Sequence, residues 1–265
     1  MTSLGHIPAA RRDHWVILTS LFTLVLLAWI YLWIDAGQMT MMQTSGGGIE
    51  NDAMGMATAD NGPWRLHSLL LTFLMWAVMM VGMMLPSATP AILLYGKLAR
   101  NRQTTPPLPS TWLFSTGYLA AWTLFSLAAT LLQAVFESGR ILSPMLTSSS
   151  LWLSALLLIV AGVYQWLPLK RACLKKCRSP LNFFLMHWRS GPLGAFSMGA
   201  EHGLYCVGCC WALMLLLFVA GVMNLLWIAL IAGFVLVEKL LPAGRLFGHV
   251  AGVGLVLTGA GMLVY

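Results

Sequence analysis

Long apolar runs separated by short polar stretches dominate this chain. We count seven runs, and several reach the roughly 20 residues that a helix needs to cross the hydrocarbon core of a bilayer. Their approximate bounds are 15–34, 67–86, 111–135, 150–168, 199–221, 224–241 and 247–264. The pattern predicts an all-α, polytopic transmembrane helical bundle, in which residues 1–265 form a single integral membrane domain. Because no small-x-small cleavage site follows the first run, we expect a retained helix rather than a removed signal peptide.

Composition agrees with a membrane protein and argues against a nucleic-acid partner. Hydrophobic residues make up 59% of the chain and charged residues only 9%, whereas soluble domains carry roughly a quarter charged residues. The mean hydropathy is +0.80. The net charge of +7 comes from Lys and Arg in short loops between apolar runs, where such residues set membrane topology.

Lys and Arg gather in alternate loops. One set of loops holds only Arg65 and Arg140, and the other set holds Arg11, Arg12, Lys97, Arg100, Arg102, Lys170, Arg171, Lys175, Lys176, Arg178, Arg189, Lys239 and Arg245. The positive-inside rule then places the N-terminus in the cytoplasm and the C-terminus outside, as an odd number of spans requires. We expect the protein in the inner (cytoplasmic) membrane of a bacterium.

Proline, glycine and one aromatic segment give local expectations within this bundle. Pro86 and Pro90 should break or end the second helix and free carbonyls that need partners. The segment 182–196 is too short to span a bilayer, which predicts a re-entrant or interfacial stretch. The last run repeats a small residue every four positions, which predicts close helix packing without chemistry: Gly244, Gly248 and Gly252.

Candidate chemistry concentrates in the fifth run, which contains His202, Cys206, Cys209 and Cys210. These four side chains fall within about 100° of arc on a helix, so they share one face. Soft sulfur ligands and an imidazole suit a thiophilic metal, Cu(I) or Zn(II). His202 and Cys210 lie about 12 Å apart along the axis, so one ion takes only a subset centred on Cys206. The alternative is that the cysteines pack as small apolar residues.

A second pair of cysteines, Cys173 and Cys177, lies just after the fourth run on the basic, inner side. On a continuing helix the two thiols face the same way, and the surrounding Lys and Arg favour thiolates. The predicted topology brings the pair near the inner end of the fifth helix, where a joint site with Cys206 is geometrically feasible. The alternative is a basic loop that anchors topology and contains two reduced thiols.

Methionines and acids add weaker candidates. Met79 and Met83 belong to a methionine-rich second run, and Met39, Met41 and Met42 lie in the outer loop. Thioethers suit Cu(I), so we expect outer-side or transit ligands here, although buried methionine also serves as flexible apolar filler. Among the intramembrane acids, Glu238 precedes Lys239 and predicts a local ion pair at the interface. No phosphate loop, Ser/His/Asp arrangement or haem-attachment motif occurs, so we assign no catalytic residue and expect no enzyme.

The chain resembles the predicted metal-binding integral membrane proteins, a family long filed as a domain of unknown function. The resemblance rests on residues 79–86, 164–180 and 203–211, and covers most of the chain from about residue 65 onward. It implies metal binding, and some members are associated with copper supply to copper enzymes such as tyrosinases. The resemblance also implies a ligand role, without catalysis, for Cys173, Cys177, Cys206, Cys209 and Cys210.

Three functions compete. We favour a membrane protein that binds Cu(I) through inner-side Cys and His residues and takes part in copper handling or delivery. Its expected partners are the lipid bilayer, a copper chaperone or copper-enzyme client, and further subunits in a homo- or hetero-oligomer. A four-ligand Cys/His set would instead suit Zn(II). The second function is a thiol–disulfide electron carrier that uses Cys206 and Cys209, with Cys173 and Cys177 as exchange partners. The third is a structural subunit of a membrane complex.

Overall fold

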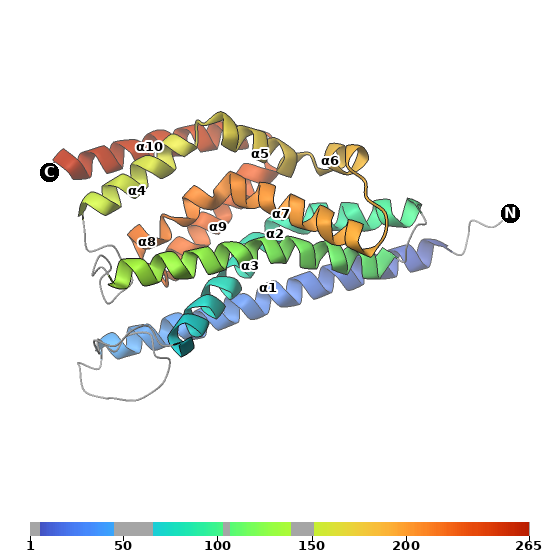
Figure 1. Ribbon diagram of the computed structural model, residues 1–265, viewed down its shortest axis with the longest axis horizontal. Coiled ribbons are helices and arrows are strands. Elements are labelled where there is room, and N and C mark those ends of the chain that lie inside the picture. Colours follow the sequence, from blue (N-terminus) through green and yellow to red (C-terminus); the bar gives the residue numbers. More distant parts are fainter. Residues whose placement is uncertain (1–5, 45–65, 103–106, 139–150, 265) are drawn as a thin grey trace.

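The computed structural model describes residues 6–44, 66–102, 107–138 and 151–264, and all regular secondary structure in these ranges is helical. Figure 1 shows an elongated bundle in which the first turn of α1 and the last turn of α10 lie at opposite ends. The helices are α1 (His6–Thr44), α2 (Leu66–Arg102), α3 (Pro107–Ser138), α4 (Leu151–Tyr164), α5 (Pro168–Arg178), α6 (Pro180–Met186), α7 (Pro192–Met214), α8 (Leu217–Ala220), α9 (Leu225–Leu240) and α10 (Gly244–Val264). The expected all-α architecture is therefore confirmed.

Each of the seven apolar runs contains a helix, but the structure supports fewer spans. Five described helices are long and apolar enough to cross a membrane, and a sixth results if the bent pair α4–α5 counts as one span. The axes of α4 and α5 differ by 62°. α9 has 16 residues, or about 24 Å at 1.5 Å per residue, which is shorter than the roughly 30 Å hydrocarbon core. Seven full spans are not confirmed.

The second helix does not break at its prolines, so that prediction is wrong. α2 runs through both Pro86 and Pro90. Pro86 has no N–H to donate to the carbonyl four residues earlier, and the indole Nε1 of Trp29 on α1 donates to this Gly82 carbonyl at 3.3 Å. A neighbouring helix thus satisfies the freed acceptor, as a continuous helix requires in a membrane.

Glycines allow α3 and α7 to approach closely. A Cβ added at Gly199 on α7 would overlap the backbone carbonyl of Phe114 on α3, and one added at Gly117 would overlap the carbonyl of Phe196. Small residues at such crossings let membrane helices pack backbone against backbone. This contact fixes α7, which carries three cysteines, against the middle of the bundle.

The glycine repeat of the last helix packs as expected. α10 lies beside α4 in Figure 1, and a Cβ added at Gly252 would lie 3.0 Å from the carbonyl oxygen of Gly162 on α4. Gly244, Gly248 and Gly252 are all buried. The packing role of this repeat is therefore confirmed.

The segment predicted to be re-entrant or interfacial forms the short helix α6 and the turn before α7. α6 has seven residues, and Phe183 and Phe184 are buried. The ring of Phe184 meets Tyr95 and Phe114 edge to face, with centroids 5.7 and 5.5 Å apart. This helix is too short to span a bilayer, and its aromatic rings attach it to α2 and α3.

Candidate metal centre

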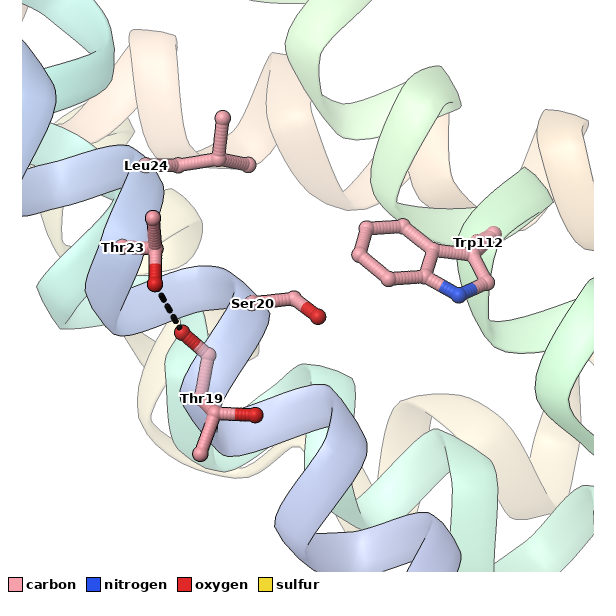
Figure 2. A pocket seen from close by; sticks show the side chains of 5 residues that line it. All are labelled: Thr19, Ser20, Thr23, Leu24 and Trp112. Atoms are coloured by element: carbon pink, nitrogen blue, oxygen red, sulfur yellow. Dashed lines mark hydrogen bonds between the residues drawn. The ribbon is translucent and has the colours of Figure 1, made fainter.

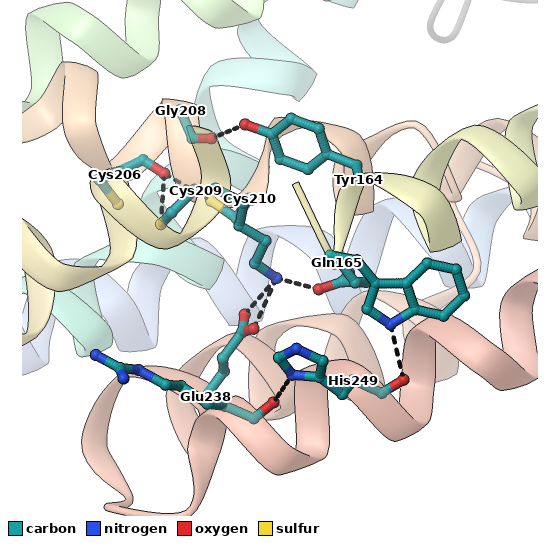
Figure 3. Close-up of polar contacts among 11 residues, drawn as sticks. Tyr164, Gln165, Cys206, Gly208, Cys209, Cys210, Glu238 and His249 are labelled. Atoms are coloured by element: carbon teal, nitrogen blue, oxygen red, sulfur yellow. Dashed lines mark hydrogen bonds and ion pairs between the residues drawn. The ribbon is translucent and has the colours of Figure 1, made fainter. Parts of the chain in front are cut away.

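The three cysteines of α7 are buried on the face that points into the bundle. All five cysteines of the chain are free thiols, and Cys206, Cys209 and Cys210 are at most 2% exposed. The thiols of Cys209 and Cys210 both donate to the backbone carbonyl of Cys206, at 3.1 and 3.0 Å. Figure 3 shows these side chains gathered on one turn of the helix.

The bend between α4 and α5 brings the other two cysteines to the same place. The thiol of Cys177 interacts with the thiols of both Cys206 and Cys209. Cys173 lies at the edge of the group, where a Cβ added at Gly208 would be 2.9 Å from its sulfur. Two helices separated in sequence by α6 therefore supply one sulfur cluster, which we call the cysteine cluster: Cys173, Cys177, Cys206, Cys209 and Cys210.

Two polar groups from other helices contact the sulfur of Cys206. The ammonium of Lys239 on α9 lies 2.8 Å from this sulfur and donates to the Ser87 hydroxyl at 3.1 Å. The hydroxyl of Tyr118 on α3 lies 3.0 Å from the same sulfur. A buried ammonium is costly without an anionic partner. A thiolate at Cys206 would be that partner, and thiolate is the form of cysteine that binds metals.

The prediction that Glu238 and Lys239 form an ion pair is wrong. Glu238 instead pairs with Lys170 on α5 at 2.7 Å, while Lys239 reaches Cys206. Successive residues on a helix point about 100° apart, so the two side chains face different neighbours. The sequence pattern thus predicts an interfacial pair for Lys239, whereas the ammonium lies beside Cys206, and no pattern indicates Tyr118 as a further neighbour of this sulfur.

A methionine, Met84, contacts the cysteine cluster. The sulfur of Met84 on α2 lies 3.9 Å from the sulfur of Cys210. Met79 and Met83 are buried in the core, and their role as transit ligands stays a prediction. The side chains of Met39, Met41 and Met42 lie outside the described residues, so their role on the outer side stays a prediction as well.

His202 is buried but faces aromatic rings. The imidazole centroid lies 6.1 Å from each of the ring centroids of Phe114, Tyr118 and Phe183, and its Nδ1 has no hydrogen-bond partner among the described residues. Within the described part of the chain, no three His, Cys, Asp or Glu side chains are arranged to hold a metal ion. Metal binding would therefore require rotation of thiols such as those of Cys209 and Cys210.

A surface groove between α1 and α3 offers no alternative site. Figure 2 shows its lining of Thr19, Ser20, Thr23, Leu24 and Trp112. The three hydroxyls donate to carbonyls of their own helix, at 2.7 to 2.8 Å. Hydroxyls that bond back to the preceding turn in this way are ordinary features of helices, so the groove carries no chemistry.

The fold and the cysteines together define an all-α protein with several helices suited to a membrane and a cluster of free thiols, three of them buried and two partly buried. Residues 73–262 match the family model PpoB2, described as a copper chaperone. The chain belongs to this copper chaperone family, and the resemblance to a copper-related membrane family is confirmed. The match extends from α2 to α10 and includes all five cysteines. No curated protein and no solved structure matches the chain.

Proposed function

We propose that this protein binds Cu(I) at the cysteine cluster and takes part in copper handling or delivery. The observation that carries the proposal is the convergence of thiols from α5 and α7 on Cys206, beside the ammonium of Lys239. Membership of a copper chaperone family supports copper as the cargo. Cu(I) favours soft sulfur ligands, and sulfur is the donor that this site offers.

The proposed ligands are Cys206, Cys177 and Cys209, with Cys210 and Cys173 as further thiols for exchange. The thiol of Cys177 interacts with those of both other proposed ligands, and the thiols of Cys209 and Cys210 donate to the Cys206 carbonyl. A low-coordinate thiolate site suits Cu(I), whereas Zn(II) takes four tetrahedral ligands. We do not retain His202 as a ligand, because aromatic rings rather than thiols surround its imidazole.

We also propose the membrane arrangement that the loop charges predict, with the N-terminus in the cytoplasm of a bacterium and seven helical passages. Two of the passages would be the bent pair α4–α5 and the short helix α9. An ion pair between Asp13 on α1 and Arg100 on α2 joins the two basic helix ends, which supports placing them on the same side. A copper chaperone or a copper-enzyme client is the partner that this arrangement would serve.

A Cu(I) competition titration tests the proposed function. The reduced, anaerobic protein should take Cu(I) from a chromogenic chelator, and a variant with Cys206, Cys209 and Cys210 changed to serine should not. Retention of Cu(I) by the triple variant would contradict the proposal. Failure of the wild-type protein to take up Cu(I), together with a reversible Cys206–Cys209 disulfide, would instead favour the thiol–disulfide carrier.

Replacing Met84 with leucine tests whether a thioether contributes to the choice of metal. We expect Cu(I) affinity to fall by about tenfold, at the lower end of what changes around metal ligands cost, because leucine fills the same space without a sulfur. Zn(II) affinity should not change, since thioethers are poor ligands for Zn(II). Met75→Leu, at another buried methionine of α2, is the matched control. Equal Cu(I) affinity of the two variants would remove Met84 from the site.

A further inference from the structure

A buried ion pair joins α5 to α9 next to the cysteine cluster. The ammonium of Lys170 lies 2.7 and 2.9 Å from the two carboxylate oxygens of Glu238, and both side chains are at most 3% exposed. The Lys170 ammonium also donates to the side-chain oxygen of Gln165. Figure 3 shows Glu238 and Gln165 pointing toward the same ammonium.

The helix α10 leaves space for this pair. A Cβ added at Gly248 would lie only 2.6 Å from a carboxylate oxygen of Glu238. Even an alanine at this position would therefore press on the carboxylate. Residues from the turn after α4, from α5, from α9 and from α10 thus form the surroundings of the ion pair.

The ion pair attaches α5 to α9 at a buried position. Lys170 and Leu174 are the buried residues of this helix, the partly buried Cys177 interacts with Cys206 and Cys209 on α7, and the hydrogen bond of Arg178 to the Leu241 carbonyl is exposed. Cys173 and Cys177 follow Lys170 by three and seven residues, so all three side chains lie on one face of the helix. An interaction that fixes the position of Lys170, such as its ion pair with Glu238, therefore also fixes the position of the two cysteines against α7.

Glu238, the partner of Lys170, also lies next to a residue of the site. Glu238 immediately precedes Lys239, whose ammonium contacts Cys206. The ion pair therefore connects the helix that supplies two thiols with the helix that supplies the cation. A buried ion pair contributes little net stability compared with apolar residues of similar volume. Net stability therefore does not explain why this pair is present, whereas the connection that it makes between α5 and α9 does.

We propose that the Lys170–Glu238 pair is a latch that positions α5, and with it Cys173 and Cys177, against the cysteines of α7. Lys170 and Glu238 are positioning residues and do not touch the metal. With the latch broken, α5 moves away from α7 and the thiol of Cys177, which is partly buried in the structure, becomes more accessible. The expectation that a broken latch weakens Cu(I) binding rests on the proposed function. The latch itself requires no metal, because the ion pair joins two side chains of the protein.

Alkylation of the metal-free, full-length protein by N-ethylmaleimide tests the latch directly. In Glu238→Gln we expect the rate at Cys177 to rise by about tenfold relative to the rate at Cys210, because local opening of α5 exposes only its own thiols. Cys210 on α7 serves as the internal reference, since its side chain is fully buried. Lys175→Met removes a charge from the exposed face of α5 and should leave the ratio unchanged.

A second variant keeps the test decisive if Glu238→Gln leaves an unpaired ammonium and fails to fold. Lys170→Met combined with Glu238→Gln has no buried charge at this point, and should show the same rise at Cys177 together with weaker Cu(I) binding. An unchanged ratio of the Cys177 and Cys210 rates, or a parallel rise at both, would overturn the latch. Because the alkylation assay contains no metal, it remains decisive even if the protein binds no copper.

Discussion

Changing Cys206 to serine is expected to lower the affinity for Cu(I) by more than the roughly 10- to 100-fold that changes around metal ligands cost. Cys206 has more neighbours at the site than any other proposed ligand: its sulfur contacts Lys239 and Tyr118, and its thiol interacts with that of Cys177. Serine preserves the volume but replaces a soft sulfur with a hard oxygen that Cu(I) disfavours. Competition titration with a Cu(I) chelator measures the loss.

Cys173→Ser is the control for this prediction. Cys173 lies at the edge of the cysteine cluster against Gly208, so its replacement should weaken Cu(I) binding less than that of Cys206. An equal loss in both variants would mean that the two thiols hold the ion jointly. No loss in either would contradict the proposed site.

Changing Gly199 to alanine is expected to destabilise the bundle by about 3 kcal/mol, at the upper end of the cost of overpacking. The added methyl group would overlap the backbone carbonyl of Phe114 on α3. A backbone atom cannot rotate away as a flexible side chain can, so α3 and α7 must separate. The thermal unfolding midpoint of the purified protein in detergent, and the yield of folded protein, measure the effect.

Gly261→Ala provides a matched control on α10. A Cβ added at Gly261 meets no atom within 4 Å, and alanine favours helix over glycine by about 1 kcal/mol. This variant should be at least as stable as the wild type. If Gly199→Ala melted at the same temperature as Gly261→Ala, the close packing of α3 on α7 would be wrong.

The sequence predicted the helices well because apolar runs of this length have few other structures open to them in a membrane. It predicted their ends and bends less well. The continuation of α2 through Pro86 depends on Trp29, an indole from another helix, which no local pattern reveals. The 62° bend between α4 and α5 likewise shortens a run that looked like one straight span.

The cysteines of the candidate site were evident from spacing on a single helix, and the topology suggested that Cys173 and Cys177 lie near them. The sequence did not indicate which side chains of α2, α3 and α9 lie beside these cysteines. Tyr118 and Met84 look like ordinary core residues in the sequence, and Lys239 looks like the partner of Glu238. Only the packing of separate helices directs Lys239 toward Cys206 and Glu238 toward Lys170. A signal was available for Lys239, since adjacent helix residues rarely pair with each other.

The most direct test of the central claim is the metal content of the protein purified under reducing, anaerobic conditions, measured by mass spectrometry. The comparison is the variant in which Cys206, Cys209 and Cys210 are all serine. The account predicts near-stoichiometric copper in the wild-type protein and its loss in the variant. Zinc in place of copper would contradict the choice of metal, and the absence of any metal from both proteins would contradict the metal site itself.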